Sequence, residues 1–133
     1  SAALEAAIGL PAFLLFVGLV IFAGRVAIAT QAVDSAATQA ARTASIARTA
    51  GDANATARTA AASSLADQSL QCVSTTVTLD TSGFSAPLGT PATVTATVQC
   101  VVKLTDLALP GVPGTKTVTA TATSPVDTFR ERR

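Results

Sequence analysis

The sequence predicts an α+β chain: a long N-terminal α-helix, apolar in its first half, with a small three- to four-stranded antiparallel β-sheet packed on its C-terminal part. Three observations predict this class. Residues 6–24 contain no charged side chain, residues 26–50 are rich in Ala and free of Gly and Pro, and apolar residues alternate with Thr from Cys72 onward. Because the hydrophobic period changes from three-and-four to two, we expect the chain to change from helix to strand near residue 71.

Residues 1–25 form the first part of the chain, an apolar helix that crosses a membrane or lies in the core of a filament. The uncharged run 6–24 has 19 residues, which as a helix span roughly 28 Å, about the thickness of a bilayer core. Pro11 lies within this run. Because proline has no amide hydrogen and its ring crowds the preceding turn, we predict a helix kink at Pro11.

Residues 26–70 form the second part, an amphipathic Ala-rich helix that is bent or broken near 51–52, where Gly and Asp interrupt the pattern. We favour a bent continuation of the first helix, with Asp52 or Asn54 as the cap of the later segment. Small apolar residues recur at alternating three- and four-residue steps, which predicts a narrow helix-packing seam with close neighbours. The seam comprises Val26, Ala29, Val33, Ala36 and Ala40.

Residues 71–133 form the third part, an antiparallel sheet domain. Alternating segments at 72–80, 92–104 and 115–123 predict three strands, joined by loops rich in Gly, Pro and Ser. One face of each strand is apolar and is expected to pack on the helix, whereas the other face is dominated by Thr. The residues expected on the inner face are Val73, Val77, Leu79, Val94, Ala96, Val98, Cys100, Val118, Ala120 and Ala122.

Composition argues against several classes of function. A net charge of +1 gives no basic surface for nucleic acid, so no nucleic-acid partner is predicted. With no His and two Cys, the chain lacks the residues of an ordinary zinc site and of Ser–His–Asp or Cys–His catalysis. The Asp residues, including Asp80 and Asp106, are dispersed, so we expect neither an enzyme nor a cofactor. Cys72 and Cys100 most simply form one disulfide in an oxidising compartment, the alternative being two buried thiols.

Three stretches together resemble the type IV pilin superfamily, and more closely the TadE-like pilins and pseudopilins of its Tad (tight adherence) branch. They are SAALEAAIGLP at the start, QAARTASIARTAG in the helix and TATATSPVDTFR near the end. The resemblance implies that a prepilin peptidase removes a leader to leave Ser1 as the first residue. The absence of Met agrees with this, and agrees equally with a sequence cut at this point.

The resemblance also implies that Glu5 neutralises the amino terminus of a neighbouring subunit and so sets the subunit register. Many type IV pilins carry a proline late in the apolar segment, where the helix loosens. Here Pro11 is the only proline of that segment, so we expect any loosening nearer the N-terminus. The alternative for Glu5 is that its charge simply marks the membrane surface.

The function expected from these features is that of a structural pilin-like subunit. It would reside in the cytoplasmic membrane as a precursor, then polymerise through its N-terminal helix into an extracellular homo-oligomeric filament, assembled by a pilus machinery, for adhesion or surface colonisation. Two alternatives remain: a minor pseudopilin that initiates or caps such a pilus, and a membrane-anchored surface domain that never polymerises.

Overall fold

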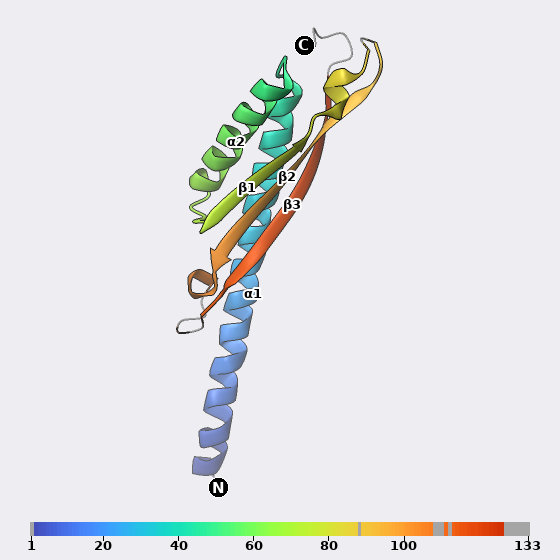
Figure 1. Cartoon of the computed structure of the whole chain (residues 1–133). Coiled ribbons are helices and arrows are strands. Elements are labelled where there is room, and N and C mark those ends of the chain that lie inside the picture. Colours follow the sequence, from blue (N-terminus) through green and yellow to red (C-terminus); the bar gives the residue numbers. More distant parts are fainter. Residues whose placement is uncertain (1, 88, 108–110, 112, 127–133) are drawn as a thin grey trace.

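The computed structural model describes residues 2–87, 89–107, 111 and 113–126. The chain begins with two helices and continues into three strands, with one short 3-10 helix in each strand connection (Figure 1). In chain order the elements are α1 (Ala2–Ser45), α2 (Ala50–Asp67), β1 (Ser74–Asp80), η1 (Ser82–Ser85), β2 (Ala92–Lys103), η2 (Leu104–Leu107) and β3 (Thr115–Val126).

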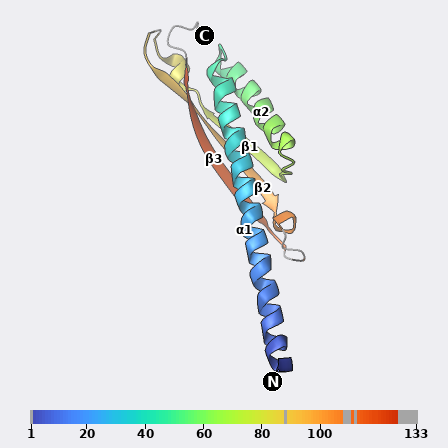
Figure 2. The ribbon, with the colours of Figure 1, turned by 180° about the vertical axis from the view of Figure 1, so that it is seen from behind.

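The predicted α+β class is confirmed. The strands form one antiparallel sheet in the order β1-β2-β3, so that β2 is central and each connection is a simple antiparallel return. The two helices cover one face of this sheet, with α1 over β2 and β3 and α2 over β1 (Figures 1 and 2). We call this two-layer unit, which includes α1 from residue 26 onward, the head. The first half of α1 extends beyond it.

The buried face of α1 within the head is wide, because the helix packs on α2 with one side and on the sheet with the other. Its buried positions recur at three- and four-residue steps and are almost all Ala, which lets both layers approach the helix closely. Val33 is the largest of them and is completely buried. The buried residues of α1 are Ala29, Ala32, Val33, Ala36, Ala37, Ala40, Ala41, Ala44 and Ser45.

The second helix is not a bent continuation of the first, as the sequence had led us to expect. α1 ends at Ser45, the chain reverses through residues 46–49, and α2 runs back antiparallel beside α1 (Figures 1 and 2). The break therefore falls before Gly51. Thr49 is the N-cap in place of Asp52 or Asn54, because its side-chain oxygen accepts a hydrogen bond from the Asp52 amide at 3.0 Å.

The antiparallel helices α1 and α2 form a hairpin. They pack together because α2 presents one stripe of small buried residues to the rest of the head. Ala53, Ala57, Ala61 and Leu65 lie four positions apart and are buried. Residues at this spacing share one helix face, and alanine at the contact permits a short interaxial distance. Two alanine-lined helices therefore pack together over their full shared length.

The faces of the sheet follow the predicted alternation. In β2 the inward residues Val94, Ala96, Val98 and Cys100 are completely buried. The inward residues of β1 and β3 also pack against the core: Val77, Leu79, Val118, Ala120 and Ala122. Val73 is an exception, because it precedes β1 and is 57% exposed. The inner face of β1 therefore begins later than expected.

The outer face of the sheet carries threonines that meet across strands. The Thr95 and Thr123 hydroxyl oxygens are 3.2 Å apart, and so are those of Thr97 and Thr121 in the next row, which matches the strand register. Thr is a good polar strand residue, and such cross-strand pairs stabilise a sheet. The face turned away from the helices is thus polar and almost uncharged.

The predicted disulfide is present. Cys72, in the segment leading to β1, is bonded to Cys100 of β2, with 5.4 Å between their Cα atoms. It links the chain directly after the helical hairpin to the centre of the sheet. The edge strand β1 is therefore covalently fixed to β2 at its first end, which complements the backbone pairing from Ser74 to Asp80.

Candidate functional site

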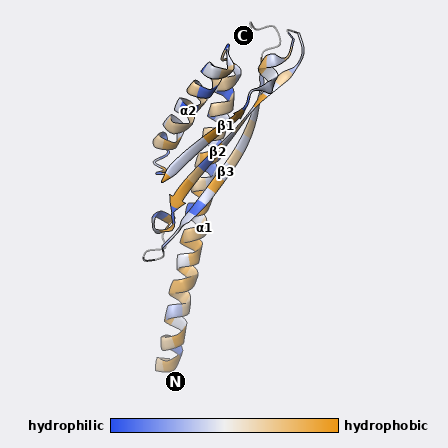
Figure 3. Cartoon of the chain, viewed as in Figure 1, coloured by the Kyte–Doolittle hydropathy of each residue, from blue (hydrophilic) through white to orange (hydrophobic). Residues whose placement is uncertain are grey.

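The most unusual feature of the molecule is the part of α1 that the head leaves uncovered. α1 is long and apolar enough to cross a membrane, and none of the residues in its most apolar stretch is buried. Figure 3 shows this half of the helix as predominantly hydrophobic from the N-terminus to the head. The candidate site is therefore a surface, the projecting segment 2–25.

The apolar surface surrounds the whole helix. Consecutive residues are rotated by about 100° in an α-helix, so four in a row sample every side of it. Phe13, Leu14, Leu15 and Phe16 are such a run, and each is between 60% and 68% exposed. A helix that is apolar all round requires an apolar environment on every side, as in a membrane or the core of an assembly.

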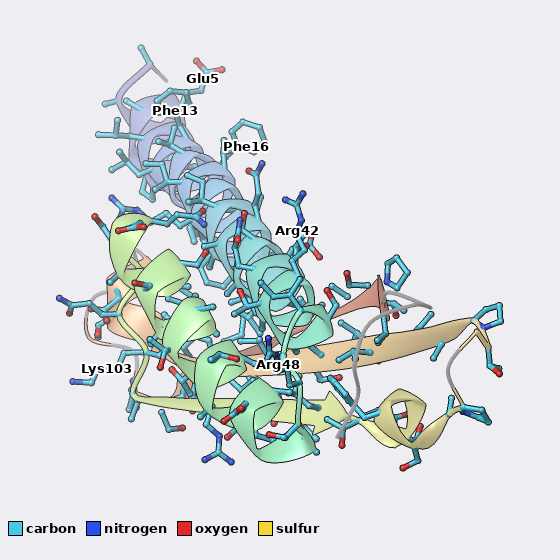
Figure 4. The ribbon with its side chains drawn as sticks, turned by 90° about the horizontal axis from the view of Figure 1, so that it is seen from above. Glu5, Phe13, Phe16, Arg42, Arg48 and Lys103 are labelled. Carbon is cyan, nitrogen blue, oxygen red and sulfur yellow. A yellow bond between two sulfur atoms is a disulfide. The ribbon has the colours of Figure 1, made fainter. Side chains whose placement is uncertain are left out.

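Glu5 is the only charged residue among positions 2–24. It lies in the first turn of α1, at the end farthest from the head and beyond Phe13 and Phe16 (Figure 4). A carboxylate in a first helical turn is favoured by the helix dipole. Ser1, the other residue of the predicted register contact, lies outside the described residues, so the role of the pair stays a prediction.

The helix continues through Pro11 and is a single element from Ala2 to Ser45. The kink that we predicted at Pro11 is therefore not a helix break, and a local loosening there stays a prediction. Three glycines of the segment face open space, because a Cβ added at Gly9, Gly18 or Gly24 would meet nothing within 4 Å. Among the described residues no contact requires these positions to be small, which leaves room for a neighbouring helix.

The predicted seam has its partners inside the same chain. Ala29, Val33, Ala36 and Ala40 are buried, and Val26 packs partly against the same core. The sequence predicts close neighbours along this seam without saying which chain they belong to. Within the described residues, α2 and the sheet pack on α1 at these positions. The sequence missed this because the matching stripe of α2, with alanine at every fourth position from Ala53, was not recognised as its partner.

A groove of about 420 Å³ lies where the head meets the projecting segment. It is formed by α1, by the chain after α2 and by η2, and it is mainly apolar with charged groups at Arg25 and Asp106. Its lining includes Arg25, Ile28, Ala29, Leu70, Asp106 and Leu107. In the described ranges, His, Cys, Asp and Glu side chains do not gather in groups of three that could hold a metal ion.

A long helix, apolar at one end and carrying a small head at the other, has the length and composition to anchor the chain in a membrane. The comparison with protein families is more specific: the model described as TadE-like protein matches residues 1–42. The resemblance predicted from the sequence is thus confirmed over the projecting segment and most of the rest of α1. Over these residues the chain is therefore similar to proteins of the Tad pilus. Residues 43–133 lie outside it.

The comparisons with curated proteins and with solved structures found no match for this chain.

Proposed function

We propose that the chain is a structural, non-enzymatic subunit that polymerises through α1 into an extracellular Tad-like pilus for adhesion or surface colonisation. The observation that carries the proposal is the projecting segment, apolar on every side and left bare by its own head. Contiguous apolar surface of this extent marks an interaction site.

The energetic argument concerns the large side chains of the segment. Burying one such side chain stabilises a protein by roughly 1.5–3 kcal/mol relative to leaving it in water. Nine of them are at least 56% exposed, and Ile21 is 46% exposed. The nine are Leu4, Ile8, Leu10, Phe13, Leu14, Leu15, Phe16, Leu19 and Val20. The segment therefore resides either in lipid or against other apolar helices.

Lipid and polymer are exchangeable environments for such a helix. Lipid tails are as apolar as Leu, so moving the helix from a bilayer into a bundle of copies changes hydrophobic burial little. Close packing and polar contacts then decide the geometry. The three open glycines of the segment permit such packing.

Glu5 fits a polymer better than a bare anchor. An ionised carboxylate within hydrocarbon is costly unless it is paired. A neighbouring amino terminus would supply a compact cation, and the pair would set the axial register of the subunits more than it adds stability. In this proposal Glu5 and Ser1 form the assembly contact.

The proposed life cycle follows from the same features. The precursor is held in the cytoplasmic membrane by α1, a prepilin peptidase exposes Ser1, and the pilus machinery transfers the subunit into the filament. The TadE-like match over residues 1–42 supports these partners. Within the filament the apolar helices would form the core and the heads the surface.

The test compares filaments sheared from cells that express the full chain. Glu5→Ala and Glu5→Gln are expected to lower the sheared polymer at least about tenfold, because a buried amino terminus would lose its partner. Asp67→Asn, at the exposed end of α2, is the control and is expected to assemble normally.

Three outcomes separate the alternatives. Normal assembly of both Glu5 variants would remove the register role and favour an acid that marks the membrane surface. Wild-type protein that is never released as polymer would overturn the filament and favour a membrane-anchored domain. Wild-type protein present at only one end of each fibre would identify a minor pseudopilin.

A further inference from the structure

Arg25 and Asp34 lie on opposite sides of α1. They are nine residues apart, which is two and a half turns of about 3.6 residues and an axial distance of roughly 14 Å. Both side chains are exposed. Arg25 lies beneath the head on the side of the groove, in line with Ala29 and Ala32. Asp34 lies on the far side of the helix, where Thr38 bonds to its carbonyl oxygen at 3.0 Å.

Neither charge is neutralised within the described chain. Salt bridges are absent among the residues that the structure describes, and neither Arg25 nor Asp34 has an ionic partner there. Asp106 lines the same groove as Arg25 without forming an ion pair with it. Each side of α1 therefore carries an available charge, of opposite sign to the other.

Of the two charged residues, Arg25 is the one whose surroundings polymerisation would change more. It directly follows the apolar run 6–24, so packing that run against neighbours removes water from around the guanidinium. A charge that loses its water needs an opposite charge close by. The acids of α1 are Glu5 and Asp34, and the proposed contact of Glu5 with an amino terminus leaves Asp34.

We infer that Arg25 of one copy pairs with Asp34 of a neighbouring copy whose α1 is parallel and displaced by about nine residues, roughly 14 Å. This contact rests on the proposed function. A polymer built by repeating one contact between unlike patches uses two different surfaces of each subunit. The half-turn offset of Arg25 and Asp34 provides such a pair of surfaces.

A phospholipid phosphate is the other group that Arg25 could bind while the chain is in the membrane. It would account for the arginine but would leave the placement of Asp34 without a role. Charge complementarity between the two sides of α1 favours a second copy. Lipid binding is therefore an outcome that the experiment must distinguish.

The experiment uses charge reversal in the full chain, with sheared polymer measured relative to precursor in the membrane. Arg25→Asp and Asp34→Arg are each expected to lower polymer at least about tenfold, and the double variant to restore it to within about twofold of wild type. Arg42→Asp is the matched control, because Arg42 is an exposed residue of α1 outside the proposed pair. It is expected to assemble normally.

Other results would overturn the pairing. If Asp34→Arg assembles normally while Arg25→Asp does not, Arg25 acts on lipid or within its own chain. Restoration of Arg25→Asp by Asp106→Arg would assign the pair to the groove of one subunit, and restoration by Glu5→Arg would assign it to a different stagger. In each of these cases wild-type filaments still form, so the proposed function stands.

A second measurement decides the matter if Arg25→Asp does not accumulate. Cysteines placed at positions 25 and 34 together are expected to give a covalent ladder with a short bis-maleimide in wild-type-like filaments. The control pair at 28 and 42, two exposed positions of α1 that leave Arg25 and Asp34 in place, is expected to give none. Equal cross-linking of both pairs, or none at 25 and 34 in intact filaments, contradicts the stagger. Absence of any wild-type polymer would instead overturn the proposed function.

Discussion

The Ser124 hydroxyl of β3 donates a hydrogen bond to the Ser45 hydroxyl, 3.3 Å away in the last turn of α1. Ser45 in turn donates to the Arg42 carbonyl oxygen at 2.7 Å. Ser45 is the buried polar residue of the core, at 6% exposure, within the part of the chain that the structure describes. The bond joins the sheet to α1 where α1 ends and the hairpin begins.

Replacing Ser45 by Ala is expected to destabilise the head by about 1 kcal/mol, because the half-buried Ser124 hydroxyl loses its acceptor. Thermal unfolding of the detergent-solubilised chain, followed by circular dichroism, measures the change. Ser35→Ala, at an exposed position of α1, makes the same change in helix propensity and is the control. Equal stability of the two variants would show that the bond contributes nothing.

The close contact between the two helices predicts that the buried residues of α2 cannot be replaced by larger ones. Ala57 is completely buried in the stripe that faces the core. Ala57→Leu is expected to destabilise the head by at least roughly 1–3 kcal/mol, because the added atoms have no space between closely packed helices. Ala66→Leu, exposed in the last turn of the same helix, is the matched control. Urea unfolding that ranks the two variants equally would contradict the packing.

The disulfide predicts a dependence of stability on oxidation. Cys72 and Cys100 close a loop with a sequence separation of 28, and the loss of such a cross-link costs about 3.6 kcal/mol in the chain-entropy treatment. The double variant Cys72→Ala/Cys100→Ala is therefore expected to unfold at a lower temperature. Adding a reductant should lower the stability of wild type to a similar extent and leave the variant unchanged. A variant that still responds to reductant would contradict the assignment.

A pH-dependent contact lies at the end of β1. The Ser82 hydroxyl and the Ser82 amide, which donates to Asp80 Oδ1 at 3.1 Å, stabilise the charged form and lower the pKa of Asp80. A lowered folded-state pKa means that this stabilisation is present above the ordinary carboxyl value, about 4, and is lost as pH falls through the folded value. Ser82→Ala is expected to raise the pKa of Asp80 in a carboxyl-carbon NMR titration. Ser85→Ala is the control. Ser85 lies at the other end of the short helix η1, which begins at Ser82, so this change should leave the pKa of Asp80 unchanged.

The spacing of apolar residues along the sequence predicted the fold class well, and for a physical reason. In β2, every second residue from Val94 to Val102 is buried, so a single alternating pattern determined both the strand and its inner face. The projecting segment was equally clear, because its uncharged run is longer than a core helix of so small a head requires.

Alanine explains most of what the sequence did not predict. Ala53 is completely buried and Ala55 is exposed, yet both are Ala, so composition does not mark the inner face of α2. The reversal at 46–49 contains neither Gly nor Pro. One signal was present, since Thr49 followed three positions later by Asp52 is typical of a helix start. A seam of small residues likewise does not tell whether its partner belongs to the same chain.

Pro11 gives the last prediction. α1 is helical on both sides of it, but proline donates no hydrogen bond, so the carbonyl of Ala7 lacks its usual amide partner and the preceding turn is weakened by ~3 kcal/mol in a soluble helix. We expect the amides of residues 8–10 to exchange faster than those of residues 14–20 in the detergent-solubilised chain. Pro11→Ala should slow that exchange by on the order of tenfold or more. Amides of α1 within the head, such as that of Ala36, are the internal reference and should not change. Uniform slow exchange along the wild-type segment would show that the helix is not loosened at Pro11, and any flexibility needed for assembly would then arise elsewhere in α1.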